Sequence, residues 1–309
     1  MDRISFYDQI ESNKRNSWIL VFVVLVTLAF LSITISAVLG AAYDWSVMFL
    51  FFIFSTVFNI AYLLVTYYKS ADIALSSVGA YPAEGQKFQQ LNNVVEEMVI
   101  AGGIPKPKVY VMPSPDINAF ATGRDPEHSV VCVTEGALQK LDRNELQGVI
   151  AHELTHVRNY DIRFVTLVAV MVGLVSILSQ LFLRSMWYGG LHGRGGDREG
   201  RGGGLMVVLL LAGLVLSIVA PLIVKLVQLA ISRKREYMAD AGGVELTRYP
   251  EGLASALEKI RDSYKTGART QVNSAVAPLF IADPVKDRFL AIFQTHPPID
   301  ERIKALRNM

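Results

Sequence analysis

Long uncharged stretches dominate the pattern of hydrophobic and polar positions near the N-terminus. No charged residue interrupts Trp18–Gly40 or Trp45–Tyr68. A helix over the first stretch would be about 34 Å long at about 1.5 Å per residue, which exceeds the roughly 30 Å of bilayer hydrocarbon. Only Ala41–Asp44 separates the two stretches, so the pattern predicts a transmembrane hairpin. A cleaved leader is the alternative, but the apolar part of a leader is only about 7–15 residues long.

Two later apolar stretches, Phe164–Phe182 and Leu205–Val224, predict a second hairpin. The first of them is short for a membrane crossing, so a pair of buried core helices is the alternative. Between them, Gly189–Gly204 is rich in glycine and arginine, which indicates a flexible loop.

Positive charge is distributed unevenly around the first hairpin. Basic residues flank it on both outer sides, at Arg3, Lys14, Arg15 and Lys69. The connection inside the hairpin has none. Because cytoplasmic flanks of membrane helices are enriched in Lys and Arg, we expect the N-terminus and residues 69–163 on the cytoplasmic side. The arginines of the Gly-rich loop run against this orientation.

Shorter periodic patterns fill the segments outside the apolar stretches. Helical spacing covers 86–101, and strand-like runs cover 108–112, 117–121 and 129–133. Asp142 followed by Glu145 is a capping-box signature that predicts a helix over 143–161. Further helices are expected at 251–264 and 299–307.

These patterns predict a mainly α membrane protein with an α+β cytoplasmic part and four transmembrane or membrane-associated helices. The membrane segments are 1–68 and 164–229, and the α+β part combines 69–163 with 230–309. Such an arrangement requires the α+β part to be interrupted by the second hairpin.

Composition narrows the function classes. The 309 residues are 51% hydrophobic and only 19% charged, against about 25% charged residues in a soluble domain. This excludes a disordered chain and a coiled coil. A net charge of +2 gives no reason to expect a nucleic-acid partner. Cys132 is the sole cysteine, so neither an intrachain disulfide nor a Cys-rich zinc site is available.

The helix predicted over 143–161 contains the sequence His-Glu-Leu-Thr-His at 152–156. Residues four apart lie on one helix face, so His152 and His156 can both reach one metal ion. Neutral imidazole suits Zn²⁺, and Glu153 can reach a metal-bound water as the general base of a zinc peptidase. Two surface histidines on an ordinary helix are the alternative, but chance placement gives this pattern only roughly 0.004 times in such a chain.

A catalytic zinc needs a third protein ligand and one position open to water. An even number of expected crossings separates His156 from Arg233–Asp240, so both lie on the same side of the membrane. Glu236 and Asp240 are four apart in that segment. One carboxylate can bind zinc while the other accepts a hydrogen bond from a ligand histidine. Taken alone, the two acids would more simply pair with the neighbouring Lys and Arg.

Three motifs in this order resemble the HtpX-type membrane-integral zinc metalloendopeptidases, relatives of the CAAX prenyl protease among the zincins with a glutamate ligand. They are the His-Glu-Leu-Thr-His helix, Glu-Tyr-Met-Ala-Asp at 236–240 and Thr-His-Pro-Pro at 295–298. The resemblance covers nearly the whole chain and implies a zincin-like protease domain with one Zn²⁺. It also implies these roles: His152, His156 and Glu236 as ligands, Glu153 as base and acid, and Asp240 as the partner of a ligand histidine.

In enzymes of this kind, an edge strand with an Asn-Ala-Phe stretch holds the substrate backbone. Asn118, Ala119 and Phe120 match it here, within the strand expected at 117–121. Peptides often bind by adding a strand to an exposed sheet edge.

Three other residues have weaker signals. His296 is interpreted either as a catalytic group that stabilises an oxyanion or as a packing histidine before a Pro-started helix. Arg302 is expected to form a surface ion pair rather than to contact the oxyanion. Asp161 is either a partner of a ligand histidine or an ordinary acid at a helix end.

The resemblance implies peptide-bond hydrolysis beside the lipid bilayer of the bacterial cytoplasmic membrane. The implied substrates are unfolded or damaged membrane proteins, as in protein quality control. Alternatives are a non-catalytic scaffold or holdase, an intramembrane-cleaving zinc protease and a prenyl-peptide protease. Polar residues around the histidine motif, such as Arg143 and Asp161, argue against a site within the bilayer, and the presence of Glu153 argues against an inactive protein.

Overall fold

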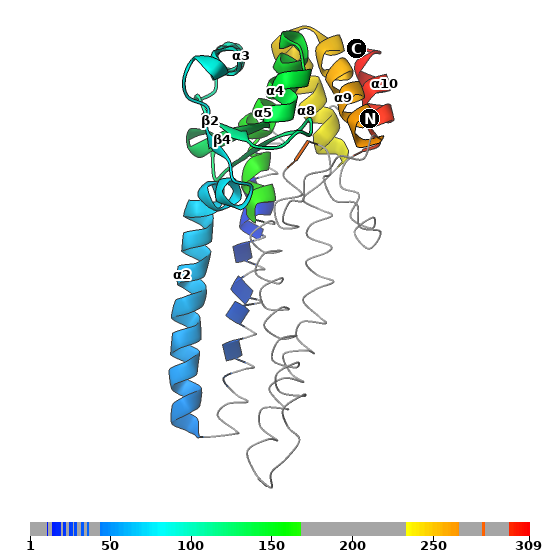
Figure 1. Ribbon diagram of the computed structural model, residues 1–309. Helices are drawn as coiled ribbons and strands as arrows, with labels where there is room; N and C mark the ends of the chain where they lie inside the picture. Colours follow the sequence, from blue (N-terminus) through cyan, green and yellow to red (C-terminus); the bar gives the residue numbers. More distant parts are fainter. Residues whose placement is uncertain are drawn as a thin grey trace, which may run out of the picture.

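The computed structural model describes residues 44–167, 233–265, 280–281 and 297–309, together with scattered positions between 11 and 36. The elements are α2 (Trp45–Ser77), β1 (Tyr81–Pro82), η1 (Gln86–Phe88), α3 (Gln89–Gly102), β2 (Lys108–Met112), β3 (Ala119–Gly123), η2 (Pro126–His128), β4 (Ser129–Thr134), α4 (Glu135–Lys140), α5 (Arg143–Arg158), α8 (Arg233–Thr247), α9 (Pro250–Lys265) and α10 (Ile299–Leu306). Figure 1 shows α2 as a long rod, with the other described elements gathered at its C-terminal end.

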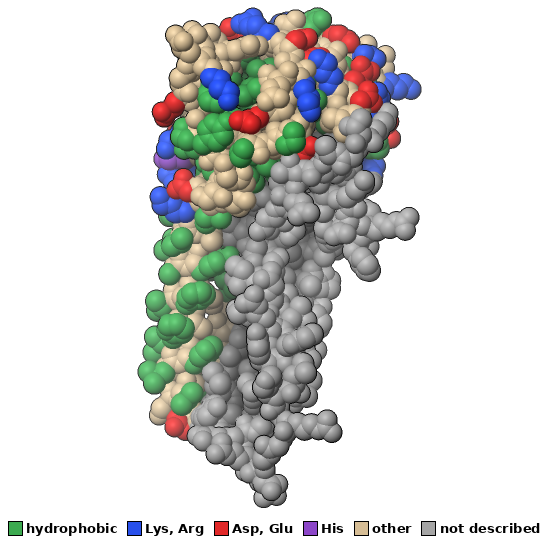
Figure 2. Space-filling model, in the orientation of Figure 1, with side chains coloured by type: hydrophobic (Ala, Val, Ile, Leu, Met, Phe, Trp, Pro, Cys, Tyr) green, Lys and Arg blue, Asp and Glu red, His purple; other side chains and the backbone are tan. Residues whose placement is uncertain are grey.

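Helix α2 is, among the described residues, the one helix long and apolar enough to cross a membrane. It has 33 residues and contains a window with a mean hydropathy of 2.2. Asp44 caps its N-terminus by accepting hydrogen bonds from the backbone N–H groups of Ser46 and Val47. Apolar side chains cover α2 in Figure 2, whereas charged side chains gather over the α+β elements. The stretch expected to cross the membrane from Trp45 is therefore a helix of suitable length and composition.

The helix continues beyond the uncharged stretch that ends at Tyr68. Lys69 and Asp72 form an exposed ion pair of 3.1 Å on the added turns. On the other face, Ala74 and Leu75 are buried in a cluster with side chains of the sheet. Helix α2 is thus packed directly against the sheet rather than joined to it by a linker.

The first apolar stretch packs beside α2 where it is described. Asn59 of α2 donates a hydrogen bond of 2.7 Å to the hydroxyl of Ser32. Leu28, Ser32 and Ser36 are buried and recur at helical spacing, so they lie on one helix face. The N-terminal transmembrane hairpin stays a prediction. Beyond residue 167, the second predicted hairpin and its Gly-rich loop lie outside the described residues.

The described strands form one four-stranded sheet in the order β1-β2-β4-β3. β1 pairs with β2 antiparallel, β2 with β4 parallel and β3 with β4 antiparallel. β3 is therefore an edge strand of this sheet. Its outer side carries one further bridge, between Phe120 and Phe280.

Helices α3, α5 and α9 share one hydrophobic core with the sheet. Each contributes side chains that are almost fully buried: Leu91, Val94 and Val95 from α3, Val149, Ile150 and Leu154 from α5, Leu253, Leu257 and Ile260 from α9, and Val131 and Val133 from β4. Helix α5 has packing partners on several sides, because α3, α8, α9, β3 and β4 all contact it. The motif helix is thereby fixed in the interior.

Most elements predicted for the α+β part are confirmed, with shifts at their ends. The strand expected at 117–121 is β3 at 119–123, and α5 ends at Arg158 rather than at Asp161. The early end has a local cause, because Tyr160 has a φ of 60°, in the left-handed region that interrupts a helix. β1 and α4 were not predicted from the sequence.

We predict that Gly148→Ala destabilises the protein, because α5 and α9 touch at this glycine. An added Cβ would lie 2.6 Å from the backbone nitrogen of Leu253, and a backbone atom cannot rotate away. We expect the free energy of unfolding to fall by about 1–3 kcal/mol, measured as a lower thermal midpoint in detergent. Gly102→Ala is the matched control, since its Cβ would lie 3.4 Å from the Leu246 side chain. Equal midpoints for both variants would contradict this packing.

Candidate metal centre

Helix α5 positions the histidine motif and is fixed at its N-terminus. Asp142 accepts hydrogen bonds from the backbone N–H groups of Asn144 and Glu145 at 2.8 and 2.9 Å. The Glu145 side chain in turn accepts from the Asp142 backbone at 2.8 Å, which completes the capping box predicted from sequence. Lys259 of α9 neutralises the buried Glu145 carboxylate at 2.6 Å. The start of the motif helix is therefore held to α9.

Helix α8 approaches α5 closely because it has two adjacent glycines. A Cβ at Gly243 would lie 3.2 Å from the backbone nitrogen of His152, and a Cβ at Gly242 would collide with the side chain of Thr155. Any larger residue would push the two helices apart. Glu236, two turns earlier on α8, is consequently presented to the histidines of α5.

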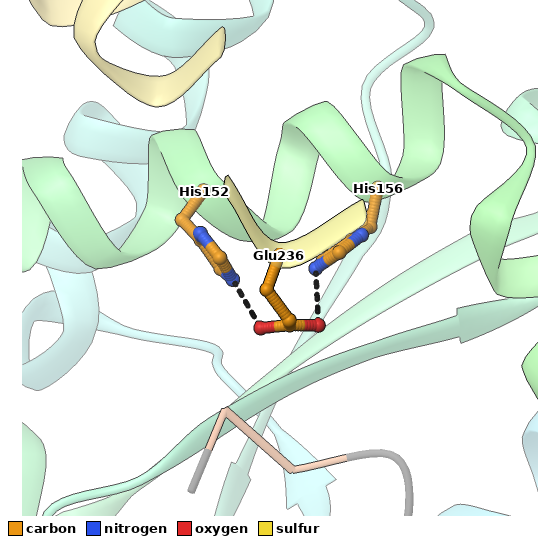
Figure 3. A group of neighbouring side chains, drawn as sticks. All are labelled: His152, His156 and Glu236. Atoms are coloured by element: carbon orange, nitrogen blue, oxygen red, sulfur yellow. Dashed lines mark ion pairs between the residues drawn. The ribbon is translucent and has the colours of Figure 1, made fainter. Parts of the chain in front are cut away.

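His152, His156 and Glu236 converge on one point in Figure 3. The Nε2 atom of His152 lies 3.8 Å from Oε2 of Glu236, and the Nε2 atom of His156 lies 3.7 Å from Oε1. One ligand atom of each residue lies within 4.8 Å of the others. Ligand atoms about 2.0–2.1 Å from a tetrahedral zinc are about 3.3 Å apart. The observed spacing therefore fits one ion after a small contraction.

A carboxylate orients each histidine from behind. His152 Nδ1 lies 3.0 Å from Oδ1 of Asp240, and His156 Nδ1 lies 2.9 Å from Oδ2 of Asp161. A hydrogen bond to Nδ1 fixes the ring tautomer and leaves Nε2 as the ligand atom. Asp240 thus lies beside His152, and its role as the partner of a ligand histidine stays a prediction. Its contact with His156 favours Asp161 as the partner of a candidate ligand histidine over an ordinary acid at a helix end.

Arg302 corrects the sequence analysis, which expected a surface ion pair. Its side chain is fully buried at 0% exposure. The guanidinium binds Asp240 through two hydrogen bonds of 2.6 and 2.9 Å and lies 3.3 Å from Oε2 of Glu236. The residue is buried because α10 packs against α8 and α9. It holds the two carboxylates of α8 in place.

The charges around the cluster do not cancel among the side chains. Four carboxylates interact with two guanidinium groups there: Glu153, Asp161, Glu236 and Asp240 with Arg235 and Arg302. When both histidines are neutral, as metal binding requires, this leaves two negative charges in a buried region, where unbalanced charge is costly. A divalent cation bound by the cluster would balance them, so the donor set and the charge both fit such an ion.

The two histidines differ in how readily they take a proton. Burial lowers the pKa of His152 to about 4, and the positive charge of Arg302 acts in the same direction against the Asp240 hydrogen bond. Burial would also lower the pKa of His156, but the hydrogen bond to Asp161 and the charge of Glu236 outweigh it and raise the pKa to about 9. His152 is therefore neutral at pH 7, whereas an ion that binds His156 must displace its proton.

The remaining candidate residues differ in where they lie and in whether the structure describes them. Glu153 is 2% exposed, in the same helix turn as His152. Asn118, Ala119 and Phe120 are buried at the start of β3, and the Ala119 carbonyl accepts a hydrogen bond of 3.0 Å from the Ile281 N–H. His296 lies outside the described residues.

We predict that Asp161→Asn weakens zinc binding by roughly 10–100-fold, because the His156 ring loses its charged partner. The affinity can be measured by competition with a chromophoric chelator. Glu245→Gln is the matched control, since it removes an exposed acid that pairs with Arg158 at 3.1 Å and should leave the affinity unchanged. An unaltered affinity in Asp161→Asn would argue that this hydrogen bond has no part in metal binding.

Comparisons with known proteins agree with this geometry. The family model described as peptidase family M48 matches residues 85–309. A protease HtpX homolog of Caldanaerobacter subterraneus subsp. tengcongensis is 46% identical, with 100% of this chain and 99% of that protein covered. A protease HtpX homolog of Streptococcus pneumoniae is 39% identical, with 98% and 99% covered. The crystal structure of S. mikatae Ste24p aligns at 18% identity and a TM-score of 0.48, over 94% of this chain and 66% of that one. The chain therefore belongs to peptidase family M48 and is a membrane-associated metalloprotease of the HtpX type.

Proposed function

We propose that the chain is a zinc-dependent endopeptidase that cleaves misfolded or damaged membrane proteins on the cytoplasmic side of the membrane. The observation that carries this proposal is the convergence of His152, His156 and Glu236, with Glu153 beside them on α5. Two imidazoles and one carboxylate form a ligand set used by catalytic zinc sites, which keep a fourth position for water.

Glu153 is the residue to which we assign the proton transfers. A zinc ion, when bound, supplies a polarised water and a Lewis acid for the scissile carbonyl. The Glu153 carboxylate takes a proton from the attacking water and later delivers it to the leaving amine nitrogen. The peptide C–N bond breaks, and the water oxygen remains in the new carboxyl group. We retain His296 as the proposed stabiliser of the oxyanion.

The position of α5 supports this proposal over the alternatives. α5 packs against the sheet, α8 and α9 and has charged residues, Arg143 and Glu145, in its first turn. An intramembrane protease would instead carry its histidines on an apolar spanning helix such as α2. A scaffold that does not cleave would have no use for Glu153 or for two histidines each oriented by a carboxylate.

The outer edge of β3 is the proposed binding site for the substrate backbone. The Ala119 carbonyl faces away from β4, because it bonds to Ile281. Backbone direction alternates along a strand, so the Ala121 N–H and carbonyl face the same outer side. An extended substrate would pair with these groups as an added strand. It would have to replace Ile281 at Ala119.

The substrate class follows from this mode of binding and from the position of α2. Only a segment without stable structure can be drawn out as a strand, so folded proteins are poor substrates. Helix α2 packs against the sheet through Ala74 and Leu75, which keeps the site close to the membrane. The Lys and Arg residues around the first hairpin support a cytoplasmic site. Unfolded segments of membrane proteins on that side are therefore the proposed substrates.

We predict that Glu153→Gln abolishes cleavage and retains the metal, because an amide cannot accept the proton of water while the three ligands are unchanged. A loss of about 100-fold or more in cleavage of casein or a membrane substrate is expected, with zinc content equal to wild type. A variant that retains zinc and cleaves at the wild-type rate would show that Glu153 is not the base.

We also predict that Ala121→Pro lowers kcat/KM for peptide substrates by roughly 10-fold or more, because proline removes the outward N–H without breaking a bond to β4. Ala121→Val is the matched control, since it adds bulk at the same buried position and keeps the N–H. The thermal midpoints of both variants serve to identify general damage to the fold. Equal kcat/KM values in two folded variants would exclude strand addition at this edge.

A further inference from the structure

A cavity lies where the first apolar stretch, α2 and the helical residues that follow α5 meet. Its volume is about 300 Å³. Most of its lining is apolar, and one arginine is part of it; the residues used below are Trp18, Val21, Leu63, Leu64, Leu167 and Arg163. We call it the junction cavity. Because α2 passes from its apolar stretch into the α+β part here, the cavity lies at the level where a membrane surface would meet the protein.

Three cations lie at or near the junction cavity and contact aromatic rings, and one of them, Arg163, lines it. The Lys14 ammonium lies 4.2 Å from the centre of the Tyr160 ring, and the Arg163 guanidinium lies 5.3 Å from the same ring. Arg124 lies 4.9 Å from the ring of Tyr68, which also lines the cavity. Arg163 further donates a hydrogen bond of 2.7 Å to the Arg124 carbonyl. These contacts fix the cations without neutralising them.

Only one of the three cations has an acidic partner among the described residues. Among the described residues, no carboxylate forms an ion pair with Lys14 or Arg163, whereas Arg124 pairs with Asp125 at 3.4 Å. Asp161, the acid nearest to Arg163 in sequence, binds His156 and lies 3.9 Å from Arg235. The mouth of the cavity therefore has a net positive charge next to an apolar interior.

We infer that the junction cavity binds one acidic phospholipid of the adjoining membrane leaflet. The headgroup phosphate, whose negative charge no headgroup cation cancels in such a lipid, meets Lys14 and Arg163, and an acyl chain enters between Trp18, Leu63 and Leu167. Basic pockets between membrane helices recognise acidic headgroups in this way. A zwitterionic lipid has no net charge and would leave both positive charges uncompensated, whereas an acidic lipid compensates one of them. The inference concerns a different site from the metal centre and does not depend on the proposed function.

The junction cavity adjoins the metal centre through one turn of the chain. Tyr160, whose ring contacts Lys14 and Arg163, adopts the left-handed conformation with a φ of 60°. A residue other than glycine seldom holds this conformation without support from its surroundings. The next residue is Asp161, which orients His156.

Trp18 provides a direct probe, because it lines the junction cavity. The chain has three tryptophans, so Trp45→Phe combined with Trp187→Phe leaves Trp18 as the only one. This variant is reconstituted in phosphatidylcholine bilayers with about 10 mol% of brominated phosphatidylglycerol or of brominated phosphatidylcholine. We expect the acidic lipid to quench Trp18 fluorescence at least roughly twofold more strongly, because the cations enrich it at the cavity.

Two substitutions test the cations separately. Lys14→Gln and Arg163→Gln should each reduce the preference for the acidic lipid. Lys14 is exposed, so its variant should fold even if Arg163→Gln, which loses the bond to Arg124, does not. Lys69→Gln is the matched control, since this lysine is at the same end of α2 but pairs with Asp72, and it should retain the preference.

Three results would overturn the inference. Equal quenching of Trp18 by the two brominated lipids would show that the cavity does not select an acidic headgroup. An equal preference at Trp45, probed alone at the far end of α2, would show general charge attraction rather than a site. If inorganic phosphate added at constant ionic strength abolishes the preference, the cations bind a soluble anion rather than a lipid headgroup.

Discussion

The approach of α8 to α5 through Gly242 and Gly243 is the contact on which the metal centre depends. About 80 residues separate Glu236 from the histidine motif, and most of the intervening chain is apolar. Local helix geometry places His152 and His156 one turn apart, but it cannot supply a third ligand. The third ligand comes from close packing of α8 on α5. Because Gly242 and Gly243 have no side chains, the backbones of the two helices lie close together. The contact between α5 and α8 therefore brings together candidate ligands that lie far apart in the sequence.

The metal centre also depends on how its buried charges are compensated. Arg302 is fully buried and holds Asp240 and Glu236, so the last helix of the chain fixes ligands that come from α8. Each buried carboxylate would be costly alone. Here each has a cation or a histidine beside it, and the remaining negative charge matches a divalent ion. We therefore expect the buried carboxylates to stabilise the fold most when a bound cation balances their charge, so that metal binding and stability are linked.

Short-range features of this fold were predictable from sequence, whereas contacts that depend on packing were not. The capping box at Asp142 and the helical spacing after it define α5, and Lys108–Met112 is a strand as expected. The burial of Arg302 could not be predicted, because its helix alone gives no sign of packing against α8. The role of Asp161 depends on the left-handed turn at Tyr160, and tyrosine gives no sequence signal for that conformation. Helix α2 extends past Tyr68 because helical structure, unlike membrane insertion, tolerates charged residues.

X-ray absorption at the zinc edge, measured on the purified full-length protein and on Glu236→Ala, tests the central claim most directly. We expect one zinc per chain in the wild type, with a first shell of nitrogen and oxygen at about 2.0–2.1 Å and no sulfur at about 2.3 Å. Glu236→Ala should lose the ion or show a shell with one protein oxygen fewer. A wild-type protein without stoichiometric zinc, or a zinc shell identical in the two proteins, would contradict the account.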